Sequence, residues 1–156
     1  MLVEVKIGAL IMDPNTNTPI VVLKGIESET ILPIWVGAYE ANAIALEIEK
    51  IVPQRPMTHD LLRNFIVQCG FRVSKVTITD LRENTFYAAI ELIDDKGKTM
   101  SLDARPSDAI ALALRMDCMI FVEQKVLDLS ASSTQTESTL EDEPVSTAED
   151  WPDLIG

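Results

Sequence analysis

The sequence predicts an α+β fold, with a mixed, largely antiparallel sheet of about six to seven strands and three helices. Two observations favour this fold class: segments in which apolar and polar residues alternate, as in strands, and segments with apolar residues at helical spacing. They follow one another in the order β-β-β-α-α-β-β-β-α-β, which indicates α+β rather than strict βαβ alternation. The length of 156 residues suits one domain.

The first third of the chain is expected to form strands. Val3, Val5 and Ile7 alternate with charged residues, and a turn-forming Asp-Pro-Asn sequence at residues 13–15 follows. The apolar run that comes next should pair with the first strand as a hairpin. The three expected strands cover residues 3–12, 19–24 and 30–36.

Two consecutive helices are expected next, at residues 38–52 and 58–69, with Pro53 and Gly70 marking their ends. The side chains expected to face the core, because they recur at helical spacing, are Ala41, Ile44, Ala45, Ile48 and Val52 in the first helix, and Leu61, Leu62, Phe65 and Ile66 in the second. The remaining expected elements are strands at 71–80, 85–93, 100–104 and 119–122, and a third helix at 107–116.

The composition divides the chain into a domain at residues 1–128 and a disordered, acidic, Ser/Thr-rich tail at residues 129–156. The tail has seven acidic residues and no Lys or Arg, whereas the domain has eighteen acidic residues against thirteen basic ones. Neither part is basic, which argues against binding nucleic acid by phosphate neutralisation alone. Trp151 in the tail is a candidate contact for a protein partner.

The cysteine content and the N-terminus predict a soluble cytoplasmic protein. Cys69 and Cys118 lie in apolar surroundings and have no second Cys or His at metal-ligand spacing, so we expect buried, reduced thiols. The N-terminus interleaves charged and apolar residues, unlike a signal peptide. No run approaches the ~20 apolar residues that span a bilayer, so no membrane partner is expected.

Two segments, at residues 55–60 and 105–108, share a pattern: Arg-Pro, then a hydroxyl residue, then Asp at the start of an apolar helix. Proline favours the first turn, a hydroxyl can cap free N–H groups, and an acid suits the helix dipole. The arginines are not explained in this way, because a cation is unfavourable beside a helix N-terminus. We therefore expect Arg55 and Arg105 to pair with acids or bind an anion, with Asp103 as a partner of Arg105.

Together with neighbouring blocks, these segments resemble the bifunctional nuclease (DNase/RNase) domain family. The blocks are Ile-Trp-Val-Gly at 34–37 with Glu-Ala at 40–41, Arg-Pro-Met-Thr-His-Asp-Leu-Leu at 55–62, Thr-Phe-Tyr-Ala at 85–88, and Asp-Ala-Arg-Pro-Ser-Asp-Ala-Ile-Ala-Leu-Ala-Leu-Arg at 103–115. The resemblance covers nearly all of residues 1–128. It implies a compact α+β domain that self-associates, as a dimer or higher homo-oligomer, and acts on DNA and RNA.

Hydrolysis of a phosphodiester needs a base, groups that bind phosphate and, in many nucleases, carboxylates that hold Mg²⁺ or Mn²⁺. The candidate catalytic residues are His59, Asp60, Asp103 and Asp108. The candidate metal ligands are Asp60, Asp103, Asp108 and Glu40. The candidate substrate-binding residues are Arg55, Arg105, Arg115 and Trp35.

Each candidate also has a structural interpretation. Asp60, Asp108 and Glu40 suit the first turn of a helix, Arg115 suits the last turn, and Trp35 suits core or subunit-interface packing. The only histidine, His59, could be a hydrogen-bonded structural residue. Three functions therefore stay open: a metal-dependent nuclease, a non-catalytic self-associating interaction module, and a binder of small anionic ligands.

Overall fold

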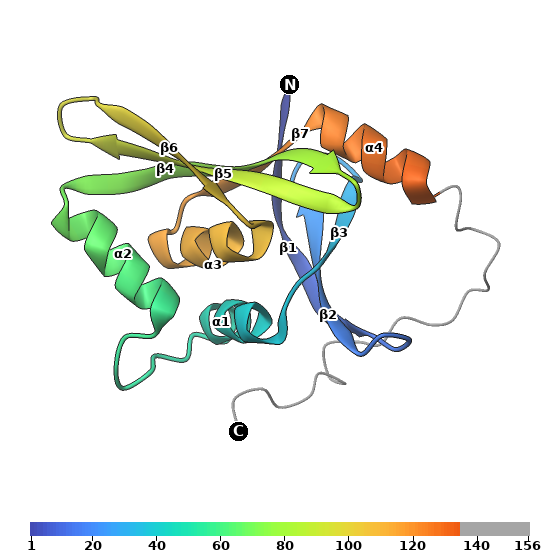
Figure 1. Cartoon of the computed structure of the whole chain (residues 1–156), viewed down its shortest axis with the longest axis horizontal. Helices are drawn as coiled ribbons and strands as arrows, with labels where there is room; N and C mark the ends of the chain where they lie inside the picture. Colours follow the sequence, from blue (N-terminus) through green and yellow to red (C-terminus); the bar gives the residue numbers. More distant parts are fainter. Residues whose placement is uncertain (135–156) are drawn as a thin grey trace.

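The structure, a computed structural model, describes residues 1–134 and contains one seven-stranded sheet with the strand order β3-β2-β1-β7-β4-β5-β6 (Figure 1). Neighbouring strands are antiparallel, except for the parallel pair of β4 and β7. The predicted fold class is therefore confirmed. The strands are β1 (Leu2–Asp13), β2 (Thr18–Gly25), β3 (Ile31–Trp35), β4 (Phe71–Arg82), β5 (Thr85–Asp94), β6 (Thr99–Ala104) and β7 (Met119–Glu123), and the helices are α1 (Ala38–Ile48), α2 (Thr58–Gln68), α3 (Pro106–Met116) and α4 (Gln124–Thr134).

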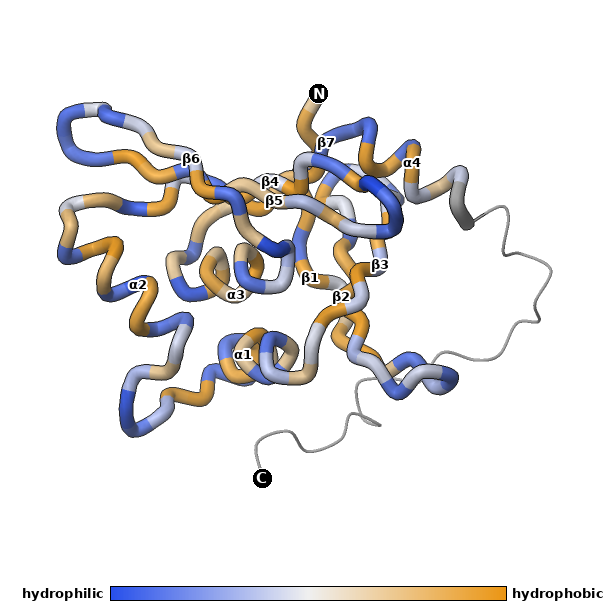
Figure 2. Tube along the Cα trace, in the orientation of Figure 1, coloured by the Kyte–Doolittle hydropathy of each residue, from blue (hydrophilic) through white to orange (hydrophobic). Residues whose placement is uncertain are grey.

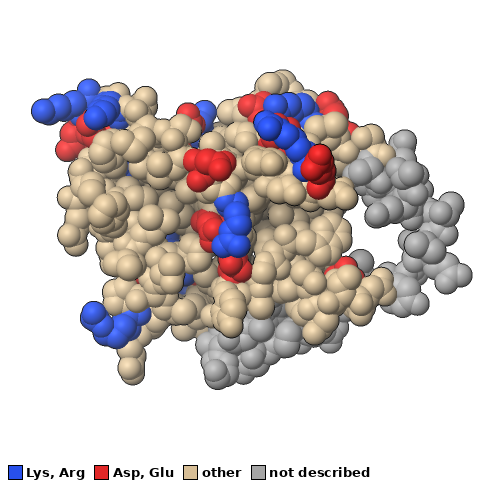
Figure 3. Space-filling view, in the orientation of Figure 1, with Lys and Arg blue, Asp and Glu red and all other residues tan. Residues whose placement is uncertain are grey.

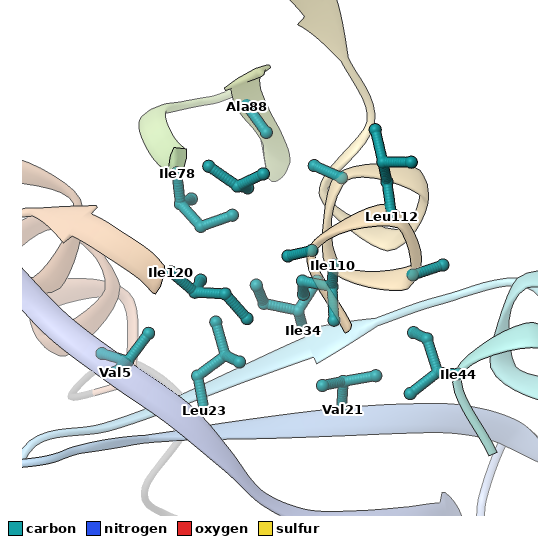
Figure 4. Close-up of a cluster of buried hydrophobic side chains, with 14 of the residues drawn as sticks. Val5, Val21, Leu23, Ile34, Ile44, Ile78, Ala88, Ile110, Leu112 and Ile120 are labelled. Atoms are coloured by element: carbon teal, nitrogen blue, oxygen red, sulfur yellow. The ribbon is translucent and has the colours of Figure 1, made fainter. Parts of the chain in front are cut away.

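Helix α3 occupies the centre of the core. Its Ile110 and Leu112 are fully buried, and Ile110 lies on the side of the helix that faces apolar side chains from β2, β3 and α1 (Figure 4). Ala109, Ala111 and Ala113 are buried as well, and their small side chains let the neighbouring elements approach the helix closely. Burial on all sides fixes α3 firmly, and with it the position of its first turn.

The fourth helix was not predicted. Helix α4 packs against β4 and β7 through buried Val126 and Leu127, on the side away from α1–α3 in Figure 1. It extends to Thr134, so the predicted start of the tail at residue 129 is wrong by several residues. The many Ser residues in this segment suggested a tail, but the buried apolar pair provides the packing that forms a helix. The rest of the predicted tail lies outside the described residues.

The apolar face predicted for the second helix is only partly correct. Ile66 is buried and Leu62 packs against the core, whereas Leu61 and Phe65 point outward, Phe65 with 65% exposure. Residues 61 and 65 lie one above the other on α2, about 100° around the axis from 62 and 66, so the neighbouring helix covers only the second pair. Figure 2 shows that the hydrophilic residues concentrate in the turns, while α2 also carries hydrophobic ones.

The first predicted helix ends earlier than expected. Helix α1 stops at Ile48, which is itself exposed, and Val52 lies beyond the helix and is exposed too. The backbone leaves the helical path at Lys50, where φ is positive at 58°, several residues before Pro53. The prediction that Ile48 and Val52 face the core is therefore wrong.

Both cysteines are free, but they are not both buried. Cys69 is exposed at the end of α2, which corrects the prediction of a buried thiol. Cys118 is half-buried, and burial raises the pKa of its thiol to about 11, so it stays protonated at neutral pH. Within residues 1–134, no helix is long and apolar enough to cross a membrane.

Candidate active-site pocket

A pocket of about 640 Å³ lies where the first turns of α1, α2 and α3 meet the end of β6. The two Arg-Pro segments come together here, because His59 comes from the first and Arg105 and Asp108 from the second. Glu40 and Asp103 line the same pocket. The fold thus brings five of the predicted site residues into one cavity.

His59 and Asp108 form a hydrogen-bonded pair on the wall of this pocket. His59 Nε2 lies 2.9 Å from Asp108 Oδ1, and both side chains are largely buried. An ionised carboxylate only accepts hydrogen bonds, so neutral His59 carries its proton on Nε2 and leaves Nδ1 as a hydrogen-bond acceptor. This pairing gives His59 the tautomer that a general base requires.

Arg105 continues the network on the other side of Asp108. Its Nε donates to Asp108 Oδ2 at 2.9 Å, and its Nη2 donates to Glu40 Oε1 at 2.8 Å. Burial would raise the pKa of Asp108, but the hydrogen bonds from Arg105 and His59 outweigh it and hold that pKa below its ordinary value. The Arg105 side chain is 66% exposed, so its guanidinium remains accessible to an anion.

The start of α3 fixes the position of Arg105. Arg105 is the N-cap residue, with extended φ and ψ of −70° and 145°, and Pro106 takes the first helical position. Asp103, the predicted partner of Arg105, is exposed and forms no hydrogen bond or ion pair within residues 1–134. Since side chains alternate along a strand, Asp103 and Arg105 were expected on one face, but the helix starts at once and turns Arg105 toward Glu40 and Asp108.

The predicted hydroxyl caps are also wrong. Neither helix start carries a capping hydrogen bond from Thr58 or Ser107. In α2 the carboxylate of Asp60 takes this role, because its Oδ2 accepts a hydrogen bond of 2.9 Å from the Met57 backbone N–H.

Arg115 and Asp60 lie apart from the pocket and link three helices. Arg115 Nε donates to Asp60 Oδ1 at 2.8 Å, and its two terminal nitrogens donate to the carbonyl oxygens of Ala111 and Ala43. The Arg115 side chain is 1% exposed. Because all these donors are used inside the protein, Arg115 is in no position to bind substrate, which corrects that prediction and favours its structural interpretation.

The four predicted metal ligands do not form a metal site in this arrangement. Asp60 pairs with Arg115, while Glu40 and Asp108 pair with Arg105; of the four, only Asp103 has no cationic partner. Across residues 1–134, no group of three or more His, Cys, Asp or Glu side chains could hold a metal ion. Within the part of the chain that the structure describes, Asp60, Asp103 and Asp108 therefore do not converge as ligands of one ion.

A second, smaller cavity of about 260 Å³ adjoins Arg105 on the side of Trp35 and Ser107. Trp35 is 52% exposed, so it does not pack in the core, and its packing at a subunit interface stays a prediction. Its indole Nε1 donates to Asp13 Oδ2 at 3.1 Å. Arg55 is exposed and lines neither cavity.

Tyr39 lines the larger pocket with 90% exposure and was missed by the sequence prediction. The available signal was an aromatic residue two positions after Gly37, at the start of a helix and next to the predicted ligand Glu40.

The surface charge agrees with the composition. Figure 3 shows basic side chains dispersed over this face in small groups, most of them beside acidic side chains, rather than gathered in one patch. The face of the domain in this view therefore has no strong positive electrostatic potential.

Glycine at position 37 lets the Glu40 carboxylate fold against the backbone. A Cβ on residue 37 would lie 2.2 Å from Glu40 Oε2, while the Gly37 φ of −73° suits any residue. We expect Gly37→Ala to keep the fold, displace Glu40 from Arg105 and lower the free energy of unfolding by about 1 kcal/mol or less, as for an exposed ion pair. Urea unfolding measures this, and Glu40→Gln should cause a similar loss. If the losses of stability were fully additive in the double variant Gly37→Ala/Glu40→Gln, the two changes would not act on the same Glu40–Arg105 contact, and this explanation would be contradicted.

The fold and the pocket define an α+β domain with a His–Asp–Arg–Glu network at the meeting point of its helix starts. The bifunctional nuclease domain pattern matches residues 21–135, so the chain belongs to the bifunctional nuclease domain family. An uncharacterized protein of Mycobacterium tuberculosis is 43% identical over 124 residues, which cover 80% of this chain and 73% of that protein.

Plant relatives carry the family's name. Bifunctional nuclease 1 of Oryza sativa subsp. japonica is 29% identical over 101 residues, covering 64% of this chain and 30% of that protein. Bifunctional nuclease 2 of Arabidopsis thaliana is 27% identical over 116 residues, covering 68% of this chain and 35% of that protein. The chain thus spans about a third of these plant proteins.

Proposed function

We propose that this protein is a nuclease that hydrolyses phosphodiester bonds of DNA and RNA in the pocket between the helix starts. The observation that carries the proposal is the His59–Asp108 pair, with Nε2 and Oδ1 2.9 Å apart, beside the exposed guanidinium of Arg105. Membership of the bifunctional nuclease domain family supports the same function. The self-association and the cytoplasmic location that we expect from the sequence are part of the proposal.

Each side chain of the network has a role in the proposed reaction. His59 Nδ1 accepts a proton from the attacking water, or from the 2′-hydroxyl of RNA, as that oxygen bonds to phosphorus. The P–O bond to the leaving nucleotide breaks in the same reaction, and the leaving oxygen takes a proton from the solvent. Asp108 accepts the Nε2 hydrogen bond and stabilises the imidazolium that results. Arg105, held between Asp108 and Glu40, presents its remaining N–H groups to the phosphate, whose negative charge increases as the new P–O bond forms.

The involvement of a metal stays a proposal. Mg²⁺ or Mn²⁺ is expected from the chemistry of many nucleases, and Asp103 is the one pocket carboxylate without a cationic partner among the described residues. A single unpaired carboxylate is not a metal site, so a metal would have to bind largely through the substrate's phosphate.

The test is a cleavage assay on the full chain with single-stranded and duplex DNA and RNA, in Mg²⁺, Mn²⁺ or EDTA. We expect activity that elutes with the protein in gel filtration and is lost in His59→Gln. Loss of activity in EDTA would support the metal-dependent form of the proposal. Retention of activity in EDTA would support the form in which His59 and Arg105 act without a metal. Equal activity in the variant would indicate a contaminant, and no activity in either protein would overturn the proposal.

A further inference from the structure

The negative charge of the domain poses a question for a nuclease: what provides affinity for a polyanion? Residues 1–128 have a formal net charge of −5, from eighteen acidic and thirteen basic residues. Arg105, the arginine of the pocket, is already paired with two carboxylates. The net charge of the domain therefore disfavours binding through many phosphate contacts, and contacts with the bases would have to provide a large share of the binding.

Exposed aromatic side chains line the two cavities that meet at Arg105. Trp35 lines the smaller cavity and Tyr39 the larger one, and Arg105 belongs to the wall of both. Trp35 and Tyr39 are four positions apart in the sequence, so their Cα atoms lie at most about 14 Å apart. A strand of a few nucleotides can therefore contact both rings while a phosphate lies at Arg105.

The indole of Trp35 is held in place for such a contact. Its one hydrogen-bond donor is satisfied by Asp13 Oδ2 at 3.1 Å, which restrains the ring while about half of the side chain stays exposed. A ring that is fixed before binding loses little conformational entropy when a base stacks on it. Tyr39, at 90% exposure, offers a second ring in the first turn of α1.

We propose that the two cavities form one site for single-stranded nucleic acid, with bases stacked on Trp35 and Tyr39 and a phosphate bound to Arg105 between them. The inference rests on the proposed nuclease function and specifies its substrate class. Bases in a duplex are stacked on one another, whereas unpaired bases are free to stack on protein rings. Single strands of DNA and RNA therefore bind and react, and perfect duplexes are poor substrates.

Fluorescence anisotropy tests binding separately from cleavage. The probe is a labelled oligothymidylate of about 12 nucleotides, a length within the usual range of single-strand site sizes. The full chain carries His59→Gln so that the probe stays intact. Trp35→Ala and Tyr39→Ala are each expected to weaken binding roughly 5- to 150-fold, as for the loss of one base–aromatic stack. Trp35→Phe, which keeps a ring but loses the bond to Asp13, should fall in between.

Two controls make the result specific. Phe65→Ala removes an exposed ring on α2 that lines neither cavity, and should leave the affinity unchanged. The logarithm of the binding constant should fall with the logarithm of salt concentration with a slope of about −0.7, because one phosphate is neutralised on a single strand. A labelled blunt-ended duplex, which has no unpaired bases, should bind about tenfold more weakly than the single strand or weaker still, because its bases are not accessible for stacking on the protein.

Equal affinity of Trp35→Ala, Tyr39→Ala and the parent would overturn the inference, as would a preference for duplex with a steep salt slope. Gel filtration of the same variants checks the alternative that these rings join copies of the chain: a changed oligomeric state with unchanged affinity would assign them to an interface. Strong binding without cleavage by the chain with His59 intact would instead contradict the nuclease function and leave the single-strand site standing.

Discussion

Replacing Arg115 with Met is expected to lower the free energy of unfolding by about 3–5 kcal/mol, the usual cost of removing one partner from a buried ion pair. The reason is the burial of the pair: Arg115 Nε lies 2.8 Å from Asp60 Oδ1, and both side chains are almost inaccessible. The substitution leaves the Asp60 carboxylate with its hydrogen bond from Met57 alone. It also removes the donors to the carbonyl oxygens of Ala43 and Ala111.

The effect should depend on pH in a defined direction. Burial would raise the pKa of Asp60, but the hydrogen bonds from Met57 and Arg115 hold it below its ordinary value. A carboxyl group whose pKa is lowered by folding stabilises the folded state at pH values above its unfolded pKa of about 3.9. That stabilisation is lost as the pH falls through the folded pKa. Without Arg115 the pKa of Asp60 rises, so the free energy of unfolding of the variant increases relative to that of the parent as the pH is lowered. The difference between the two proteins should therefore narrow toward low pH.

Urea unfolding of four proteins separates the ion pair from general damage to the core. Asp60→Asn keeps an acceptor for the Met57 N–H, so the double variant Asp60→Asn/Arg115→Met should be less destabilised than the sum of the singles, by roughly 1–3 kcal/mol. Additive losses at neutral pH would show that the Asp60–Arg115 pair contributes nothing beyond packing. The expected cleavage activity of folded Arg115→Met is close to the parent's, since Arg115 does not line the pocket.

The sequence predicted most of the fold because its local signals agree with one another. Alternation defined the strands, and proline or glycine lies beside the start of α1, both ends of α2 and the start of α3. Helix α4 was missed because two apolar residues, Val126 and Leu127, form its buried contact in a segment otherwise rich in Ser. The outward direction of Phe65 was missed because helical spacing shows which residues share a face, not which face the neighbouring elements cover.

The site was predictable as a set of residues, but not as a set of contacts. His59, Arg105, Asp108 and Glu40 were all candidates, and all four join one network. Which carboxylate pairs with which cation depends on the path from β6 into α3 and on the approach of α1, both of which are tertiary features. Asp60 and Asp108 follow the same local pattern, yet one binds a buried arginine and the other lines a pocket.

The Asp108→Asn variant is expected to cleave nucleic acid about 10²- to 10⁴-fold more slowly, the usual contribution of general acid–base catalysis. An amide nitrogen at this position can donate to His59 Nε2, which places the proton of the neutral ring on Nδ1 and removes the base. The expected loss lies in kcat rather than KM, because Asp108 acts on the reacting centre through His59. The double variant His59→Gln/Asp108→Asn should be little worse than either single variant, since the two residues act as a unit.

Stability measurements guard against the alternative that Asp108 only starts a helix. Its partner Arg105 is mostly exposed, so Asp108→Asn should cost about 1 kcal/mol or less, too little to unfold the domain. Burial would raise the pKa of Asp108, but the hydrogen bonds from Arg105 and His59 hold it below its ordinary value, so its stabilising contribution is present at neutral pH and is lost only as pH falls through the folded pKa. Asp95→Asn, the same change at an exposed turn residue, is the matched control and should leave activity and stability unchanged. If Asp108→Asn destabilises as expected but cleaves at the parental rate, the His59–Asp108 pair is a structural contact, and the base must be sought elsewhere in the pocket, with Asp103 as the next candidate.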